Sequence, residues 1–209
     1  MDGECRHPRF ARAYPGAAAR ADRRGAAEHR RRLVHGLAGR VIEVGAGNGR
    51  NFAHYPPTVT EVIAIEPEPT LRALATQAET AVPVTVLAGV AEALPCADGE
   101  LDAAVVSLVL CSVPDQGRAL AELRRVLRPG GELRFYEHVL GRHQPKRALS
   151  RLADRSGLWP ALAAGCHLAR ETDAAIAAAG FAIEHCERFQ FRAAAFEPRL
   201  TYVLGSARR

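Results

Sequence analysis

Short apolar runs along the chain are separated by longer segments in which apolar residues recur at helical spacing. The runs that we predict to be strands are Arg40–Val44, Glu61–Ile65, Pro83–Leu87, Leu101–Ser107 and Glu132–His138. The segments that we predict to be helical are Ala26–Leu37, a short helix ended by Pro56 and Pro57, Pro67–Ala81, Pro114–Leu127 and Glu171–Ala179. This alternation of strands and helices predicts an α/β fold, a doubly wound parallel sheet with helices on both faces.

The two ends of the chain depart from this alternation. Two strands are expected near the C-terminus, at about Ala182–Gln190 and Leu200–Leu204, where they can pair antiparallel. Residues 1–25 show little periodicity, and we expect a loosely ordered or lid-like arm there. Leu140–Arg170 is also irregular and contains the only tryptophan, Trp159, which would pack in the core or roof a pocket. No long linker or internal repeat interrupts the chain, so we expect a single domain.

Composition narrows the class of protein. The net charge is +5, and Lys146 is the only lysine, so arginine supplies nearly all of the positive charge. The arginines are densest between Arg20 and Arg32, where we favour a solvated helix face over contact with acidic lipid or nucleic acid. Aromatic residues make up only 6% of the chain and are not interleaved with basic ones. This argues against a nucleic-acid partner.

Cysteine usage and the N-terminus indicate the compartment. The five cysteines are widely spaced without a C-x-x-C pair, which argues against a disulfide framework and against a zinc site. A reducing compartment fits this pattern. No apolar run resembles a signal peptide or is long enough to span a bilayer. We therefore expect a cytoplasmic protein without stable membrane insertion, and the sequence leaves the oligomeric state open.

A glycine-rich stretch follows the first expected strand. From Val41 to Phe52 the chain reads V-I-E-V-G-A-G-N-G-R-N-F. A strand that runs into a glycine turn and a helix brings the backbone close to a charged small molecule. Its third glycine, Gly49, comes one position earlier than in the dinucleotide fingerprint, which would have it where Arg50 stands. The stretch therefore favours a nucleoside-sulfonium or similar cofactor over NAD.

An acidic residue ends the second expected strand. In a doubly wound sheet this residue, Glu66, would lie beside the glycine stretch, where its carboxylate can accept hydrogen bonds from ribose hydroxyls. The alternative is an acid that stabilises the N-terminal end of the following helix. Because the glycine stretch precedes it, we favour the ribose role.

Several further segments carry a family resemblance. They are E-V-G-A-G-N-G (43–49), I-E-P (65–67), A-E-A-L-P (91–95), L-D-A-A-V-V-S (101–107) and L-R-P-G-G (127–131). With them, the chain resembles a class I S-adenosylmethionine-dependent methyltransferase of the type 11 superfamily from about Leu33 to Leu204. The resemblance implies a Rossmann-like seven-stranded sheet whose last strand is antiparallel, and S-adenosyl-L-methionine as the cofactor.

The resemblance also implies where the cofactor binds. Glu43 and the loop glycines would face its methionine part, Glu66 its ribose, and Leu71 with the Val90–Glu92 segment its adenine. Val90 stands where many relatives have an aspartate that bonds adenine, so Glu92 or a backbone amide would substitute. The complete candidate set is Glu43, Gly45, Ala46, Gly47, Asn48, Gly49, Glu66, Pro67, Leu71, Ala91, Glu92 and Leu108.

A narrower resemblance concerns the methyl acceptor. The segments N-F-A-H-Y-P-P (51–57), L-V-L-C-S-V (108–113), Y-E-H-V (136–139) and G-C-H-L-A-R-E-T (165–172) are similar to the animal thiol S-methyltransferases of the methyltransferase-like seven group. They imply a small-molecule acceptor and, among small molecules, a thiol. The alternatives are O- or N-methylation of a small metabolite or lipid precursor, and a non-catalytic cofactor-binding module.

A thiol acceptor must be deprotonated, because the thiolate is the nucleophile. His138 is the candidate base or thiolate-stabilising cation; the alternative is a histidine that bonds a loop carbonyl. Glu137 would orient that ring or form a salt bridge with an arginine. Cys111 is interpreted as a small residue of the pocket wall. Cys166 and His167 suggest a metal pair with His138, but without further ligands at suitable spacing we expect no metal site.

Overall fold

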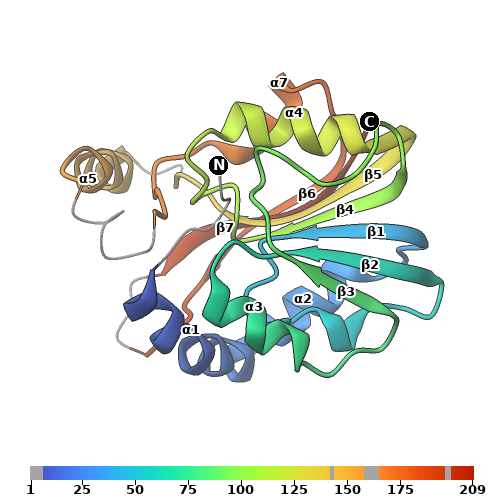
Figure 1. Ribbon diagram of the computed structural model, residues 1–209. Helices are drawn as coiled ribbons and strands as arrows, with labels where there is room; N and C mark the ends of the chain where they lie inside the picture. The colour runs from blue at the N-terminus through green and yellow to red at the C-terminus, as the bar shows by residue number, and fades with distance from the viewer. Residues whose placement is uncertain (1–6, 142–143, 158–164, 196–198) are drawn as a thin grey trace.

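The computed structural model describes residues 7–141, 144–157, 165–195 and 199–209. Its centre is a seven-stranded sheet with the strand order β3-β2-β1-β4-β5-β7-β6 (Figure 1). The strands are β1 (Gly39–Val44), β2 (Val59–Ile65), β3 (Val84–Leu87), β4 (Leu101–Ser107), β5 (Leu127–His138), β6 (Ala182–Phe191) and β7 (Leu200–Arg208). Strands β1 to β5 pair in parallel, whereas β7 is antiparallel to both β5 and β6. The predicted fold class, with its antiparallel last strand, is confirmed.

Helices cover both faces of the sheet, as the alternating pattern predicts. Helices α4 (Gln116–Val126) and α7 (Thr172–Ala178) lie on one face, and α1 (Pro8–Ala21), α2 (Ala27–Val34) and α3 (Pro69–Thr76) lie on the other (Figure 1). Side chains of successive strand residues point to opposite faces. Accordingly Ile42 belongs to the core beneath α4, and Val41 belongs to the core beneath α2.

The parallel strands all end at the same edge of the sheet, which positions the candidate site. The glycine stretch follows β1, Glu66 follows β2, Leu108 follows β4 and His138 closes β5. Ligands of open α/β sheets bind outside the carboxyl ends of the strands. Four separate parts of the sequence thus meet at one edge through topology alone.

The N-terminal segment is more ordered than its sequence suggested. Residues 8–21 form α1, and a π-helical turn, Asp22–Ala26, joins it to α2. The proline at the start of α1 stands in the first helical turn, where a missing backbone N–H costs nothing. These residues are thus helical and not loosely ordered, because alanine and arginine favour helix even without a regular apolar stripe. The lid-like alternative stays a prediction.

The segment that was expected to be irregular also contains a helix. Helix α5 (Gln144–Arg155) stands apart from the two layers of helices that cover the sheet (Figure 1). The hypotheses for Trp159 concern a residue outside those that the structure describes. Within the described ranges, no helix combines the length and apolar character needed to cross a bilayer.

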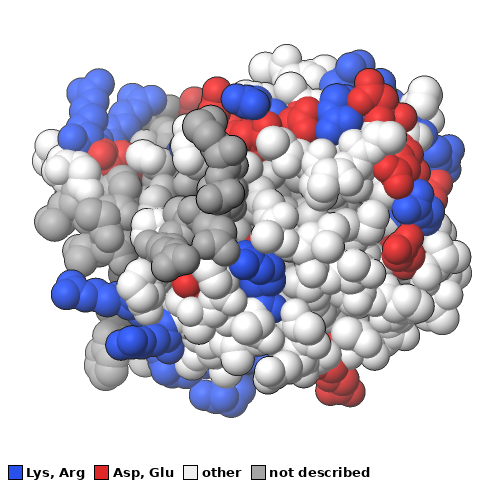
Figure 2. Space-filling model, in the orientation of Figure 1, with Lys and Arg blue, Asp and Glu red and all other residues white. Residues whose placement is uncertain are grey.

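The arginine-rich N-terminal segment is only partly a solvated face. Figure 2 shows Lys and Arg side chains gathered toward the edge where α1 lies, and mixed charges over α4. Arg31 pairs with Glu28 and Arg32 pairs with Glu187. Arg30, by contrast, is buried. The expectation of a solvated face is wrong for this one residue, because its guanidinium lies inside the protein against Asp22, Asn51 and Ser107.

Candidate active site

The glycine stretch, residues 45–49, is folded so tightly that its three glycines, all with positive φ, leave little room for a side chain. Gly45 has a φ of 69°, and a Cβ atom there would lie 2.4 Å from Cγ2 of Val109. Gly47 has a φ of 59°, and its Cβ would lie 3.0 Å from the ring of Tyr14 in α1. Only glycine combines a positive φ with such close approach. The stretch is thus pressed between the turn after β4 and helix α1.

Glu66 lies against the glycine stretch, as the topology predicted. Its Oε2 atom accepts a 2.7 Å hydrogen bond from the amide of Gly47, and its Oε1 atom accepts a 2.9 Å bond from the amide of Glu68. Burial raises the pKa of Glu66 to about 7, and the two amide bonds partly offset that rise. Each carboxylate oxygen can accept a second bond. The side chain therefore retains acceptor capacity for ligand hydroxyls.

Glu43 occupies a different environment from the one that the resemblance implied. Its carboxylate accepts hydrogen bonds from Asn51 Nδ2 at 2.9 Å and from the Tyr55 hydroxyl at 2.7 Å. Burial raises its pKa to about 7, against the lowering effect of those two bonds. Both oxygens are thus engaged by side chains of this protein. Glu43 is buried and these two bonds give it a structural role, whereas its contact with the cofactor stays a prediction.

The network around Glu43 extends to a buried cation. Arg30 Nη1 lies 3.2 Å from Oδ1 of Asn51 and 3.4 Å from Oγ of Ser107, and Arg30 Nε lies 3.1 Å from a carboxylate oxygen of Asp22. Removal of the partner of a buried arginine destabilises a protein strongly, because an uncompensated charge stays buried. Sequence reasoning missed Arg30, because in the printed chain it is one of several neighbouring arginines with no distinguishing pattern.

On the side expected for adenine, the candidates fall into two groups. Leu71 and Ala91 are buried. Glu92, however, accepts a 3.2 Å hydrogen bond from the amide of Asp115 through its side chain. Its carbonyl accepts a 3.0 Å bond from Arg118. Glu92 therefore secures the start of α4, and its interpretation as a substitute for the adenine-binding aspartate is not supported by this geometry.

The turn after β4, residues 108–113, is held by Glu137. The two carboxylate oxygens accept hydrogen bonds from the amides of Val109 (2.9 Å), Leu110 (3.1 Å) and Cys111 (3.2 Å). Burial raises the pKa of Glu137, and the three amide bonds oppose this rise. Neither predicted role, orientation of His138 or a salt bridge to arginine, matches these contacts. Glu137 is an anchor for the turn.

This anchor holds an unusual backbone conformation. Leu108, the first residue of the turn, has a φ of 62°, which is rare for a residue other than glycine. Its amide donates to the carbonyl of Tyr136 at 2.8 Å. Strained positions of this kind persist where surrounding contacts over-determine them, and they cluster at functional sites.

His138 lies among thiols. Its Nδ1 atom is 3.4 Å from Sγ of Cys166, and its ring meets the ring of Tyr202 edge-on at 4.3 Å between centroids. Its Nε2 atom is buried without a hydrogen-bond partner among the described residues. A hydrogen bond with Cys166 and burial raise the pKa of the Cys111 thiol well above its usual range. A loop carbonyl is therefore not the partner at Nδ1.

The segments with acceptor-side resemblance are joined by hydrogen bonds. The amide of His167 donates to the carbonyl of Cys111 at 2.8 Å. The guanidinium of Arg170 donates to the carbonyls of Leu110 at 2.5 Å and Val113 at 2.7 Å. The structure thus brings residues 108–113, 137–138 and 165–170 into one wall. The resemblance implied that these three segments are neighbours, whereas no pattern within any one segment of the sequence indicates it.

The residues around the glycine stretch fit S-adenosyl-L-methionine. The glycines of residues 45–49 let a ligand approach the backbone closely. The amides of Gly45, Ala46, Gly47 and Gly49 already donate to groups of this protein, so the stretch supplies a surface and few free donors. Asn48 Oδ1 is buried without a hydrogen-bond partner in the described ranges, so it can accept from an ammonium group. Glu66 offers oxygen acceptors to ribose. These acceptors match the ammonium group and the ribose hydroxyls of a ligand with an amino-acid end and a nucleoside end.

Comparisons with known proteins find methyltransferases. Residues 42–135 match the methyltransferase domain family. The human thiol S-methyltransferase TMT1A is 37% identical over 147 residues, covering 68% of this chain and 59% of that protein. The mouse thiol S-methyltransferase TMT1B is 35% identical over 146 residues, covering 66% and 59%. The chain therefore spans less than two thirds of the length of these relatives.

A solved structure extends the likeness over most of the chain. The S-adenosylmethionine-dependent methyltransferase of Mesorhizobium loti has a TM-score of 0.64 and 26% identity, and the match covers 90% of this chain and 100% of that one. Sequence, strand order and the glycine stretch agree on one assignment. The chain belongs to the class I S-adenosylmethionine-dependent methyltransferases.

Proposed function

We propose that this protein transfers the methyl group of S-adenosyl-L-methionine to a small-molecule thiol. The relatives named thiol S-methyltransferases support the acceptor class. The observation that carries the proposal is the position of His138. Its unpartnered Nε2 atom lies in the wall formed with residues 108–113, and Val109 of that wall packs on Gly45 of the cofactor cradle. The turn after β4, residues 108–113, thus connects the imidazole of His138 to the cofactor cradle, residues 45–49.

We infer that the cofactor lies across residues 45–49. Asn48 Oδ1 would accept from the ammonium group of its amino-acid end, and the carboxylate of Glu66 would accept from its ribose hydroxyls. Leu71 and Ala91 would provide an apolar wall for adenine. The remaining proposed contacts come from Ala46, Pro67 and the backbone of Leu108, with Glu43 supporting the cradle from below. Tyr14 lies against Gly47, so α1 would cover this end of the cofactor.

The bound cofactor supplies a sulfonium methyl group that is already activated toward nucleophiles. The protein must therefore align a thiolate behind this methyl group and exclude water. His138 would take the thiol proton at Nε2, or stabilise the thiolate as a cation. The Glu137 anchor would keep the acceptor wall in register with the cradle.

A methyl-transfer screen with isotopically labelled cofactor tests the acceptor class directly. Small thiols, phenols and amines are offered to the full chain, and labelled products are identified by mass. We expect methylated thiols. Transfer to phenols or amines alone would replace the thiol assignment with O- or N-methylation. Calorimetry adds a second test: S-adenosyl-L-methionine should bind and NAD should not. Cofactor binding without transfer to any acceptor class would indicate a non-catalytic module and overturn the proposal.

A further inference from the structure

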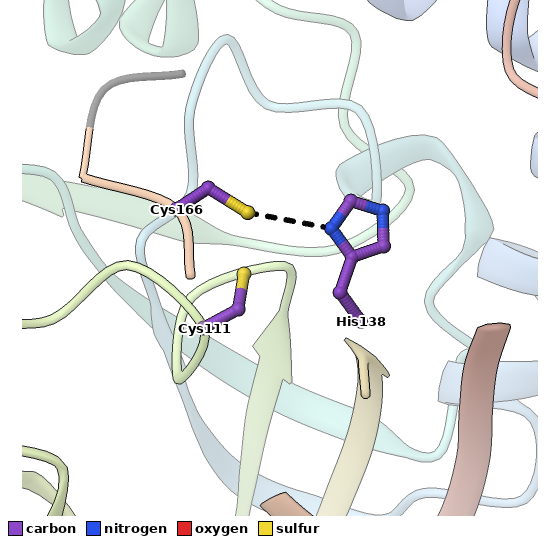
Figure 3. A group of neighbouring side chains, drawn as sticks. All are labelled: Cys111, His138 and Cys166. Atoms are coloured by element: carbon purple, nitrogen blue, oxygen red, sulfur yellow. Dashed lines mark hydrogen bonds between the residues drawn. The ribbon is translucent and has the colours of Figure 1, made fainter. Parts of the chain in front are cut away.

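Three side chains from separate segments converge in the acceptor wall. Cys111 comes from the turn after β4, His138 from the end of β5, and Cys166 from the segment before α7. In Figure 3 the two thiols and the imidazole point toward one another. One ligand atom from each residue lies within 4.8 Å of the other two. Both cysteines are buried and His138 is half-buried, so the group lies in the wall and not on the open surface.

The separations suit a tetrahedral metal ion. With Zn–S bonds of about 2.3 Å and Zn–N bonds of about 2.0–2.1 Å, neighbouring ligand atoms lie about 3.5–3.8 Å apart. The observed distance from His138 Nδ1 to Cys166 Sγ is 3.4 Å. Thiolate and imidazole are the ligands that thiophilic, borderline-soft cations such as Zn²⁺ prefer. The three ligand atoms lie within 4.8 Å of one another, and adjustment of the side chains without backbone movement would bring them to the tetrahedral spacing.

The backbone around the three ligands is already fixed. Glu137 accepts from the amide of Cys111, and the carbonyl of Cys111 accepts from the amide of His167, the residue after Cys166. A Cβ atom on Gly165 would lie 3.0 Å from the carbonyl oxygen of Ser112, so the two loops touch closely at this point. Ligands held in this way lose little freedom when an ion binds.

We propose that Cys111, His138 and Cys166 form a three-ligand site for a thiophilic divalent cation of the Zn²⁺ class, with the fourth coordination position open to the acceptor thiol. Among the described residues this group has three members, and three protein ligands with one open position are typical of catalytic zinc sites. The proposal replaces the sequence-based expectation of no metal site. Only the role of the open position rests on the proposed thiol methylation.

In this site His138 would be a metal ligand, and the ion would activate the acceptor thiol in place of the base role proposed for His138 above. The cation takes Cys111 and Cys166 as thiolates, and their protons leave to water. The acceptor thiol binds as a thiolate in the open position and releases its own proton to water. A lone pair of this sulfur forms the new bond to the methyl carbon, and the old bond from that carbon breaks with its electron pair retained by the cofactor sulfur. The neutral thioether is a weak ligand and dissociates.

Cobalt(II) titration of the full chain tests the site without any assay of activity. The reduced, metal-depleted protein should bind one Co²⁺ per chain, with thiolate-to-cobalt charge transfer in the near ultraviolet and the visible bands of tetrahedral cobalt. Cys111→Ser and Cys166→Ser should each weaken Co²⁺ binding by about 100-fold or more, because even changes outside the ligand shell cost about 10–100-fold. Cys186→Ser, at an exposed position, is the matched control. Circular dichroism verifies that each variant is folded.

Opposite results separate this site from the proposed function. No charge-transfer band, or a band that persists in folded Cys111→Ser and Cys166→Ser, would overturn the site. Addition of 2-mercaptoethanol to the cobalt form should shift the visible bands, and an unchanged spectrum would overturn the open fourth position. Cobalt binding without thiol methylation would leave the site and remove the proposed function. Full thiol methylation by metal-depleted protein would leave the proposed function and overturn the role of the ion in activating the acceptor.

Discussion

The carboxylate of Glu66 accepts a 2.7 Å hydrogen bond from the backbone amide of Gly47. This bond joins the carboxyl end of β2 to the centre of the glycine stretch after β1. It fixes the position of a buried acidic group relative to the backbone on which the cofactor would lie. The relationship yields the first prediction.

Glu66→Ala should weaken binding of S-adenosyl-L-methionine by about 1–3 kcal/mol, because charge-assisted hydrogen bonds to the ribose are lost. Isothermal titration calorimetry measures the change. Glu79→Gln is the control, since Glu79 is exposed. Equal affinity in Glu66→Ala and the native chain would remove Glu66 from the cofactor site.

Gly45→Ala should destabilise the protein more than Gly130→Ala. Both glycines have positive φ, 69° and 75°, so alanine incurs about 1–2 kcal/mol of backbone strain at each. At Gly45 the new methyl group would also meet Val109 Cγ2 at 2.4 Å, whereas nothing lies within 4 Å at Gly130. Overpacking adds about 1–3 kcal/mol. Urea denaturation of both variants checks the difference, and equal losses would contradict the crowding at Gly45.

Glu43 should make stability depend on pH in a specific direction. Its pKa is about 7 in the folded chain and 4.5 as the ordinary value, so the folded state binds the proton more tightly. The resulting stabilisation is complete below pH 4.5 and is lost as pH rises through 7. The free energy of unfolding of the native chain, minus that of Glu43→Gln, should therefore fall between these values by up to about 3 kcal/mol. Denaturation curves at several pH values measure it, and a rising difference would refute the assignment.

Glu137→Gln should destabilise the turn after β4. The substitution keeps the shape but puts an amide donor against backbone amides that now donate to a carboxylate. Leaving one buried donor unsatisfied costs about 1–3 kcal/mol. Urea denaturation, with the exposed Glu184→Gln as control, tests this. A change no larger than that of the control would argue against the anchoring role.

His138→Gln should lower the rate of thiol methylation without changing cofactor affinity. A general base contributes about 10²–10⁴-fold, and most of this loss should disappear above the acceptor thiol's pKa of about 8.5, where the thiolate forms unaided. Steady-state rates across pH, with exposed His185→Gln as control, measure the effect. A loss that persists at high pH would assign His138 to the metal site in place of the base role. Native activity at every pH would exclude it from both.

Local sequence determined much of the fold. Apolar runs such as Leu101–Ser107 mark strands that are buried on both faces. A strand covered on both faces needs apolar residues at successive positions, so its signal is local in the sequence. The glycine stretch and Glu66 could be recognised for the same reason: backbone conformation and the residue after a strand are local properties. The boundaries were less accurate. Strand β7 extends to Arg208 and not Leu204, and α3 ends at Thr76 and not Ala81.

Tertiary structure decided how the polar groups are used. Only packing distinguishes the buried Arg30 from its exposed neighbours. Hydrogen bonds from elsewhere in the chain make Glu43, Glu92 and Glu137 structural anchors. The resemblance had implied cofactor contacts for Glu43 and Glu92, and Glu137 was expected to orient His138 or to pair with an arginine. Cys111, His138 and Cys166 become neighbours because β4 and β5 pair in parallel and the segment before α7 docks on their ends. The sequence by itself thus determined the cradle, whose parts are local, whereas the acceptor wall depends on contacts between residues far apart in the chain.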